Sequence, residues 1–168
     1  MLPDTLRRRS LKLALEILLF LVVFLLLKAY LQRDLVTGEA PPLEGELLNG
    51  QTVSLQDYRG KPLLLHFWAS WCSVCKLEQG SINAVSADHP VLTIAMQSGT
   101  AEEVSDYLAQ QGLDFPVLVD EQGDLARRFG VRGVPTSFIL DPSGRITFAE
   151  VGYTTGWGLR ARLWWAGL

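Results

Sequence analysis

The pattern of hydrophobic and polar positions separates an apolar segment near the N-terminus from a longer part in which short apolar runs alternate with polar stretches. Residues 11–31 contain an uninterrupted apolar run from Ile17 to Leu27. As an α-helix, the whole segment 11–31 would extend over roughly 31 Å, which is enough to cross the hydrocarbon core of a bilayer. The pattern therefore predicts one transmembrane anchor over residues 11–31.

The charges on the two sides of this run predict its orientation. Arg7, Arg8 and Arg9 precede it, whereas the stretch that follows, QRDLVTGEA, is close to neutral. Because positively charged flanks stay in the cytoplasm, we expect residues 1–10 there and the rest of the chain outside. The alternative is a cleaved signal peptide, but the run is long for one and no small-x-small cleavage site follows it. In a bacterium, the chain would be a single-pass protein of the inner membrane with its domain in the periplasm.

The polar, proline-containing stretch after the apolar segment predicts a linker over residues 32–42, with the folded domain over residues 43–168. Within the domain, Asn49 and Gly50 indicate a β-hairpin, because this pair supplies the positive φ angles of a tight turn. With 48% apolar residues, the chain can bury one good core.

Further apolar runs bounded by turn residues predict the rest of the domain. Thr100 and Glu103 match a capping box at the start of one helix. Strands and helices alternate first and a strand hairpin then closes the sheet, which indicates an α/β domain around a mixed sheet. We expect strands at 61–68, 91–96, 115–120, 136–141 and 145–152, and helices at 72–88, 101–112 and 125–130.

Composition and cysteine usage narrow the chemistry. The net charge of −3 is small and has the wrong sign for a nucleic-acid partner. The two cysteines, Cys72 and Cys75, cannot build a disulfide scaffold, and a structural zinc site would have only His66 and His89 as further Cys or His ligands. A c-type haem needs histidine after the second cysteine, where Lys76 stands. The pair is therefore interpreted as redox-active, without metal or organic cofactor.

The expected place of the two cysteines predicts their roles. A helix starting at Cys72 points unpaired N–H groups and its positive end at that sulfur, which favours the thiolate that attacks disulfides. Cys75 follows one turn later and is close enough to release a mixed disulfide by attacking Cys72. The dipeptide between them, Ser73 and Val74, has no charge or histidine to stabilise the thiolate strongly, so we favour a reductase or isomerase over an oxidase.

Three stretches, FWASWCSVC, GVPT and FILDPSGRI, resemble the thioredoxin superfamily, in particular its membrane-anchored extracytoplasmic branch with the cytochrome c maturation thioredoxins. Similarity to the suppressor-of-copper-sensitivity protein D group is found in three longer sequence segments, HFWASWCSVCKLEQGSI, HPVLTIAMQSG and EVGYTTGWGLRARLWW. The resemblance covers Leu43 to the C-terminus. It implies a thioredoxin fold, in which helices flank a mixed central sheet. The N-terminal hairpin and the one N-terminal transmembrane helix, both predicted above from the residues, complete the expected architecture.

The resemblance also implies substrate-binding residues. Pro135 matches a proline that in this superfamily is cis and lies against the cysteine pair; an ordinary trans proline in a loop is the alternative. A cis bond would expose the backbone of Val134 for pairing with a substrate strand, with Thr136 beside it. Trp71, directly before Cys72, is expected to cover one side of the nucleophile or to serve packing alone.

Two residues are candidates for taking the proton of Cys75. His66 occupies the position of a buried aspartate in ordinary thioredoxins, and a neutral imidazole has a suitable pKa. Its alternative is a hydrogen-bonded core histidine. Glu78 matches a glutamate of the cytochrome-maturation branch, and its alternative is an exposed helix residue.

The predicted function is a membrane-tethered protein-disulfide reductase that accepts electrons from a transmembrane donor and passes them to oxidised periplasmic proteins. The resemblance implies substrates linked to copper stress. A copper-binding chaperone that holds Cu(I) with the two thiolates is the alternative. The tail over residues 157–168 is amphipathic. It either packs on the sheet or contacts the membrane or a partner, in which case Arg160 and Arg162 would face lipid headgroups.

Overall fold

The computed structural model describes residues 4–168, with side chains from Lys12 onward, and divides into two units between Arg33 and Asp34. The first unit contains α1 (Asp4–Gln32). Its stretch Lys12–Gln32 has a mean hydropathy of 2.4 and, among the described residues, is the one helix long and apolar enough to cross a membrane. The start of the segment expected in the cytoplasm, residues 1–3, lies outside the described residues.

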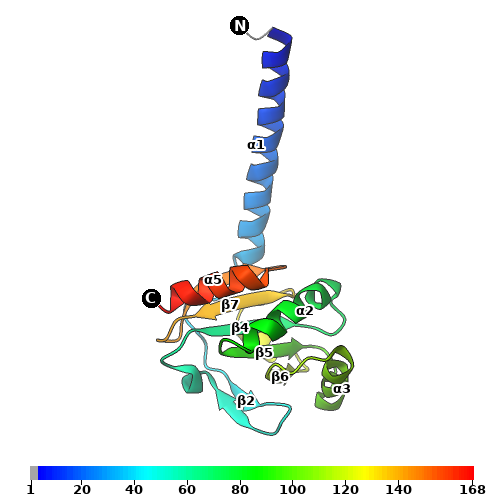
Figure 1. Cartoon of the computed structure of the whole chain (residues 1–168), viewed down its shortest axis with the longest axis vertical. Helices are drawn as coiled ribbons and strands as arrows, with labels where there is room; N and C mark the ends of the chain where they lie inside the picture. Colours follow the sequence, from blue (N-terminus) through cyan, green and yellow to red (C-terminus); the bar gives the residue numbers. More distant parts are fainter. Residues whose placement is uncertain (1–3) are drawn as a thin grey trace. The chain divides into compact units, whose positions relative to one another are not determined.

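A six-stranded mixed sheet forms the centre of the second unit (Figure 1). The central strand β4 (Leu63–Trp68) pairs in parallel with β5 (Val91–Met96) and antiparallel with β7 (Thr136–Leu140). The strand order is β1-β8-β7-β4-β5-β6. The edge strands are β1 (Gly38–Glu39) and β6 (Val117–Asp120), and β8 (Arg145–Val151) lies between β1 and β7. The expected α/β class with a mixed sheet is confirmed.

Each face of the sheet has its own apolar cluster, because alternate residues of β4 point to opposite sides. Leu64 and Trp68 belong to the cluster under α2 (Ser73–Ser86), α3 (Ala101–Gln111) and α5 (Gly156–Ala166). Leu65 and Phe67 belong to the cluster that includes residues of α4 (Asp124–Arg128) and of the N-terminal part of the unit. In Figure 1, α5 lies along β7, while α3 lies near β6, toward the opposite edge of the sheet.

The N-terminal hairpin is formed by β2 (Glu44–Glu46) and β3 (Thr52–Ser54), followed by the short 3-10 helix η1 (Leu55–Tyr58). Gly50 has a φ of 81°, as a tight turn requires, but Asn49 does not share the positive φ expected for it. The N–H of Gly50 donates to the carbonyl of Leu47, so this turn is longer than a two-residue loop.

The compact unit begins earlier than the boundary expected at residue 43. Leu35 is buried, the N–H of Val36 donates to the carbonyl of Phe129 at 3.2 Å, and β1 pairs with β8. Most of the expected linker, residues 32–42, therefore belongs to the folded unit, because its backbone and one apolar side chain find partners that are distant in sequence.

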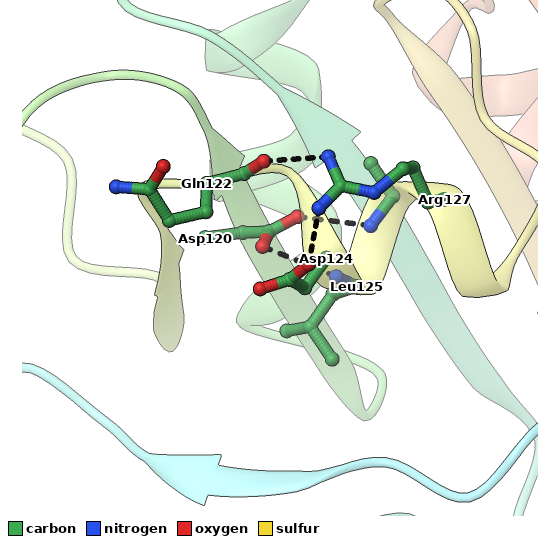
Figure 2. A network of polar contacts seen from close by, with 6 residues as sticks. Asp120, Gln122, Asp124, Leu125 and Arg127 are labelled. Carbon is green, nitrogen blue, oxygen red and sulfur yellow. Dashed lines mark hydrogen bonds and ion pairs between the residues drawn. The ribbon is translucent and has the colours of Figure 1, made fainter.

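Hydrogen bonds at the helix starts explain two elements of the fold. The predicted capping box of α3 is confirmed, with the N–H of Glu103 bonded to Thr100 and the N–H of Thr100 bonded to Glu103. At α4, the buried carboxylate of Asp120 accepts the N–H groups of Leu125 and Ala126 at 3.1 and 2.9 Å (Figure 2). Asp120 ends β6 and thereby fixes where the next helix begins.

Candidate functional site

The two cysteines lie where β4 leads into α2, and they form a disulfide. Cys72 is the N-cap of α2, and its Sγ accepts a hydrogen bond from the N–H of Cys75 at 3.1 Å. Both residues are buried, Cys72 with 7% and Cys75 with 3% of its surface exposed. When the pair is reduced, the same N–H and the positive end of the helix favour a thiolate at Cys72.

A loop before β7 faces this disulfide. The carbonyl oxygen of Val134 lies 3.5 Å from Sγ of Cys72, and the bond between Val134 and Pro135 is cis. The hydroxyl of the buried Thr136 donates to the carbonyl of Gly133 at 2.7 Å. The structure thus brings Val134 to Cys72, whereas the Thr136 hydroxyl is used within the loop.

Trp71 is 61% exposed beside the disulfide, and its Nε1 donates to the carbonyl of Gln97 at 3.0 Å. The N–H of Ser70 donates to Oγ of Ser98 at 3.0 Å. Gln97 has a φ of 47°, which is unusual for a residue other than glycine. Sequence reasoning missed Gln97 and Ser98, because they follow β5 and reach the cysteine turn only through the parallel pairing of β4 with β5.

Glu78 lies on the buried face of α2 together with Cys75, one helical turn away. It is fully buried, so the alternative of an exposed helix residue is wrong. Its Oε2 accepts the N–H of Thr154 at 3.3 Å, while Oε1 has no hydrogen-bond partner among the described residues. Burial raises the pKa of Glu78 to about 7, and the bond from Thr154 opposes this effect.

His66 is buried in β4, and its Nδ1 lies 2.9 Å from Oγ of Ser137 on the neighbouring strand. Burial lowers the pKa of His66 to about 3, so the imidazole is neutral near pH 7. These contacts are those of a hydrogen-bonded core histidine, the alternative that the sequence left open.

The site offers few ligands beyond the cysteines. Among residues with described side chains, no group of three or more His, Cys, Asp or Glu residues is arranged to hold a metal ion. Binding of Cu(I), the alternative function, would use the thiolates of Cys72 and Cys75.

With this geometry established, comparisons with known proteins identify the family. Residues 36–149 match the model of the AhpC/TSA family. The chain belongs to this family. It is 30% identical over 161 residues to a thioredoxin-like protein of Haemophilus influenzae, covering 95% of this chain and 96% of that protein. It is also 31% identical over 124 residues to the thiol-disulfide oxidoreductase ResA of Geobacillus thermodenitrificans, covering 71% of each.

Solved structures support the same relationship. A thiol:disulfide interchange protein from Chlorobium tepidum matches with a TM-score of 0.68 and 26% identity over 79% of this chain and 98% of that one. StoA from Bacillus subtilis matches with a TM-score of 0.62 and 27% identity over 72% and 95%. The expected thioredoxin fold and enzyme class are confirmed: the chain is a thiol-disulfide oxidoreductase of the ResA and StoA type with the pair Cys72–Cys75.

Proposed function

We propose that this oxidoreductase is a reductase of protein disulfides, anchored in a bacterial inner membrane by residues 11–31 with its domain in the periplasm. The observation that carries the proposal is the disulfide of Cys72 and Cys75 at the start of α2, beside Val134 and one turn from the buried Glu78. Residues 1–10 are assigned to the cytoplasm because of the three arginines before the apolar run.

The first step uses the reduced pair. The thiolate of Cys72 attacks one sulfur of a substrate disulfide, so that a Cys72–substrate bond forms and the substrate S–S bond breaks. The released substrate thiolate takes a proton from water. The carbonyl of Val134, 3.5 Å from Sγ of Cys72, lies where it can accept a main-chain hydrogen bond from an extended substrate segment.

The second step releases the substrate. Cys75 loses its proton and attacks Sγ of Cys72, which forms the Cys72–Cys75 disulfide and frees the second substrate sulfur as a thiolate. Glu78 is the better proton acceptor of the two candidates. Its pKa of about 7 matches neutral pH, whereas a pKa of about 3 makes His66 a weak base. The carboxylate also lies on the same helix face as Cys75.

The residues around the nucleophile support the proposed direction of electron flow. Neither Ser73 nor Val74 adds charge stabilisation to a thiolate, so the reduced form lacks the extra stability of a strong oxidant. The substrate gains two electrons and two protons, and a transmembrane dithiol donor must restore the pair. Resemblance to the suppressor-of-copper-sensitivity protein D group supports substrates linked to copper stress.

The redox state of the pair in cells tests this function. Rapid acid quenching followed by thiol alkylation should find Cys72 and Cys75 mainly reduced, and a mainly oxidised pair would contradict the reductase direction.

Cys75→Ser should accumulate mixed disulfides with extracytoplasmic proteins, whereas the matched variant Cys72→Ser should not. Retention of the full chain in carbonate-washed membranes, with the domain open to protease added to spheroplasts, checks the anchor and its orientation.

A further inference from the structure

The last helix, α5, is apolar on two opposite faces. One face is buried in the core through Leu159, Leu163 and Ala166. The other face is exposed, and its positions follow the spacing of one helical stripe. This tryptophan face consists of Trp157 (85% exposed), Ala161 (exposed), Trp164 (65%) and Trp165 (65%), and the exposed Leu168 (84%) follows just beyond the end of the helix.

Tryptophan is an informative residue on such a surface. A contiguous exposed apolar patch on a soluble domain marks a contact with a partner or a membrane. The indole ring combines a large apolar body with one N–H group, and it is enriched where apolar and aqueous media meet at the bilayer surface. Three exposed indoles on one helix stripe therefore fit the interfacial layer of a membrane.

The charges beside the tryptophan face are matched. Arg160 forms an ion pair with Asp88 at 2.6 Å, and Arg162 lies 3.4 Å from Glu150. These contacts bind α5 to the end of α2 and to β8, so the helix is held in place before anything docks. Both arginines are paired with carboxylates of the same protein, so they add no net positive charge beside the tryptophan face. Such a surface suits a zwitterionic lipid surface.

The path of the chain brings a membrane within reach. Only Arg33 separates the end of α1 at Gln32 from the compact unit that begins at Asp34. Within that unit, the first strand is β1, at the edge of the sheet next to β8. Helix α5 packs on β7 and contacts β8 through Arg162, so it lies toward the same edge, away from β6 and α3 (Figure 1).

We propose that the tryptophan face of α5 lies in the interfacial layer of the bilayer. There it holds the catalytic domain against the periplasmic surface of the same membrane in which α1 is anchored. The inference rests on the proposed anchor. Because α5 packs against α2, this contact would also fix the orientation of the Cys72–Cys75 pair relative to the membrane.

Fluorescence of the full chain in vesicles tests the proposal. The protein is reconstituted in dioleoylphosphatidylcholine with and without the lipid brominated on its acyl chains, which quenches indoles that reach the interface. We expect strong quenching in the native chain and its loss in the triple variant Trp157→Gln, Trp164→Gln, Trp165→Gln. Trp68 and Trp71 remain in both proteins, so the difference in quenching between them reports on the three replaced indoles. Adding Gln110→Trp on the exposed side of α3 to the triple variant provides the control, and this indole should stay unquenched.

The outcomes separate the face from the anchor. Protein that floats with the vesicles but shows equal quenching with and without the three tryptophans would overturn the proposal and leave the anchor intact. Protein that does not float would refute the anchor itself. Emission shifted to the blue without quenching, together with a doubled mass after cross-linking, would assign the face to a second copy and overturn the proposal. Unchanged reduction of a small soluble disulfide by the triple variant shows that its domain is folded.

Discussion

Glu78 lies one turn of α2 beyond Cys75 on the buried face of the helix, and its Oε1 has no hydrogen-bond partner among the described residues. A buried, half-bonded carboxyl group is costly in its charged form, which is why its pKa rises to about 7. The same feature makes it able to take a proton at neutral pH. Both the reaction rate and the stability of the domain should therefore depend on the protonation of Glu78.

Glu78→Gln should slow the resolution of the mixed disulfide by about 10²-fold, because the amide cannot accept the proton of Cys75. In the native protein, the rate should increase as pH rises through about 7, where Glu78 becomes ionised, and this inflection should vanish in the variant. Stopped-flow measurement of resolution across pH checks both. Glu102→Gln, on the exposed start of α3, serves as the matched control.

His66→Asn separates the two candidate bases. The neutral imidazole is bonded to Ser137 and has a pKa near 3, so the rate per folded molecule should stay level while stability falls. A slower rate with a changed pH profile in His66→Asn, and an unchanged one in Glu78→Gln, would reverse the assignment.

Stability should depend on pH through the same two groups, with opposite signs. The carboxyl of Glu78 titrates at 4.5 in the unfolded chain and at about 7 in the folded one, so the folded state binds the extra proton and stability falls as pH rises between these values. The difference corresponds to on the order of 3 kcal/mol. His66 acts in the other direction, because its pKa falls from 6.5 to about 3 and stability is lost on acidification within that range.

Urea denaturation of the oxidised protein across pH measures this effect. Glu78→Gln has no titrating carboxyl, so its stability relative to the native protein should increase between pH 4.5 and 7 and then stay constant. A difference that does not vary with pH would show that the pKa of Glu78 is not raised.

Elements with local signals could be predicted from the sequence. The strand at residues 91–96 has the expected bounds because its apolar run is delimited by polar and turn residues, and α3 has a capping box and a left-handed Gly112 at its end. The two-residue β1 could not be predicted, because Gly38 and Glu39 show no alternation and become a strand only through pairing with β8.

In the candidate site, too, the features with a local sequence signal could be predicted, and those that depend on tertiary contacts could not. Cys72 and Cys75 were found from their spacing, which is a local property. The burial of Glu78 was not, because a charged residue on a helix is usually solvated and only the tertiary contacts of α2 place it inside. The hydrogen bond from Trp71 to Gln97 joins residues that follow two neighbouring strands, so no local pattern in either stretch of sequence predicts it.

Trp71→Phe should weaken substrate binding while leaving the chemistry nearly intact. Phenylalanine keeps an aromatic ring beside Cys72 but cannot donate to the carbonyl of Gln97, so the ring loses its fixed orientation. We expect a higher KM for a protein disulfide with little change in kcat, and a larger increase in Trp71→Ala. Steady-state kinetics with a folded disulfide substrate checks this, and an equal fall of kcat in both variants would instead indicate a role in the chemical step.

Gly130→Ala should strongly destabilise the domain, because a Cβ at this position would overlap the backbone carbonyl of Asp34. Its φ of 70° adds the strain of a left-handed residue. Gly112 provides the matched control, since its φ of 64° is similar and no atom lies within 4 Å of the Cβ position. Gly112→Ala should therefore cost about 1 kcal/mol from backbone strain alone, and Gly130→Ala at least about 2 kcal/mol more. Urea denaturation of both variants measures the difference. Equal losses would mean that the segment beginning at Asp34 is not packed against Gly130, and that the folded domain starts later in the chain.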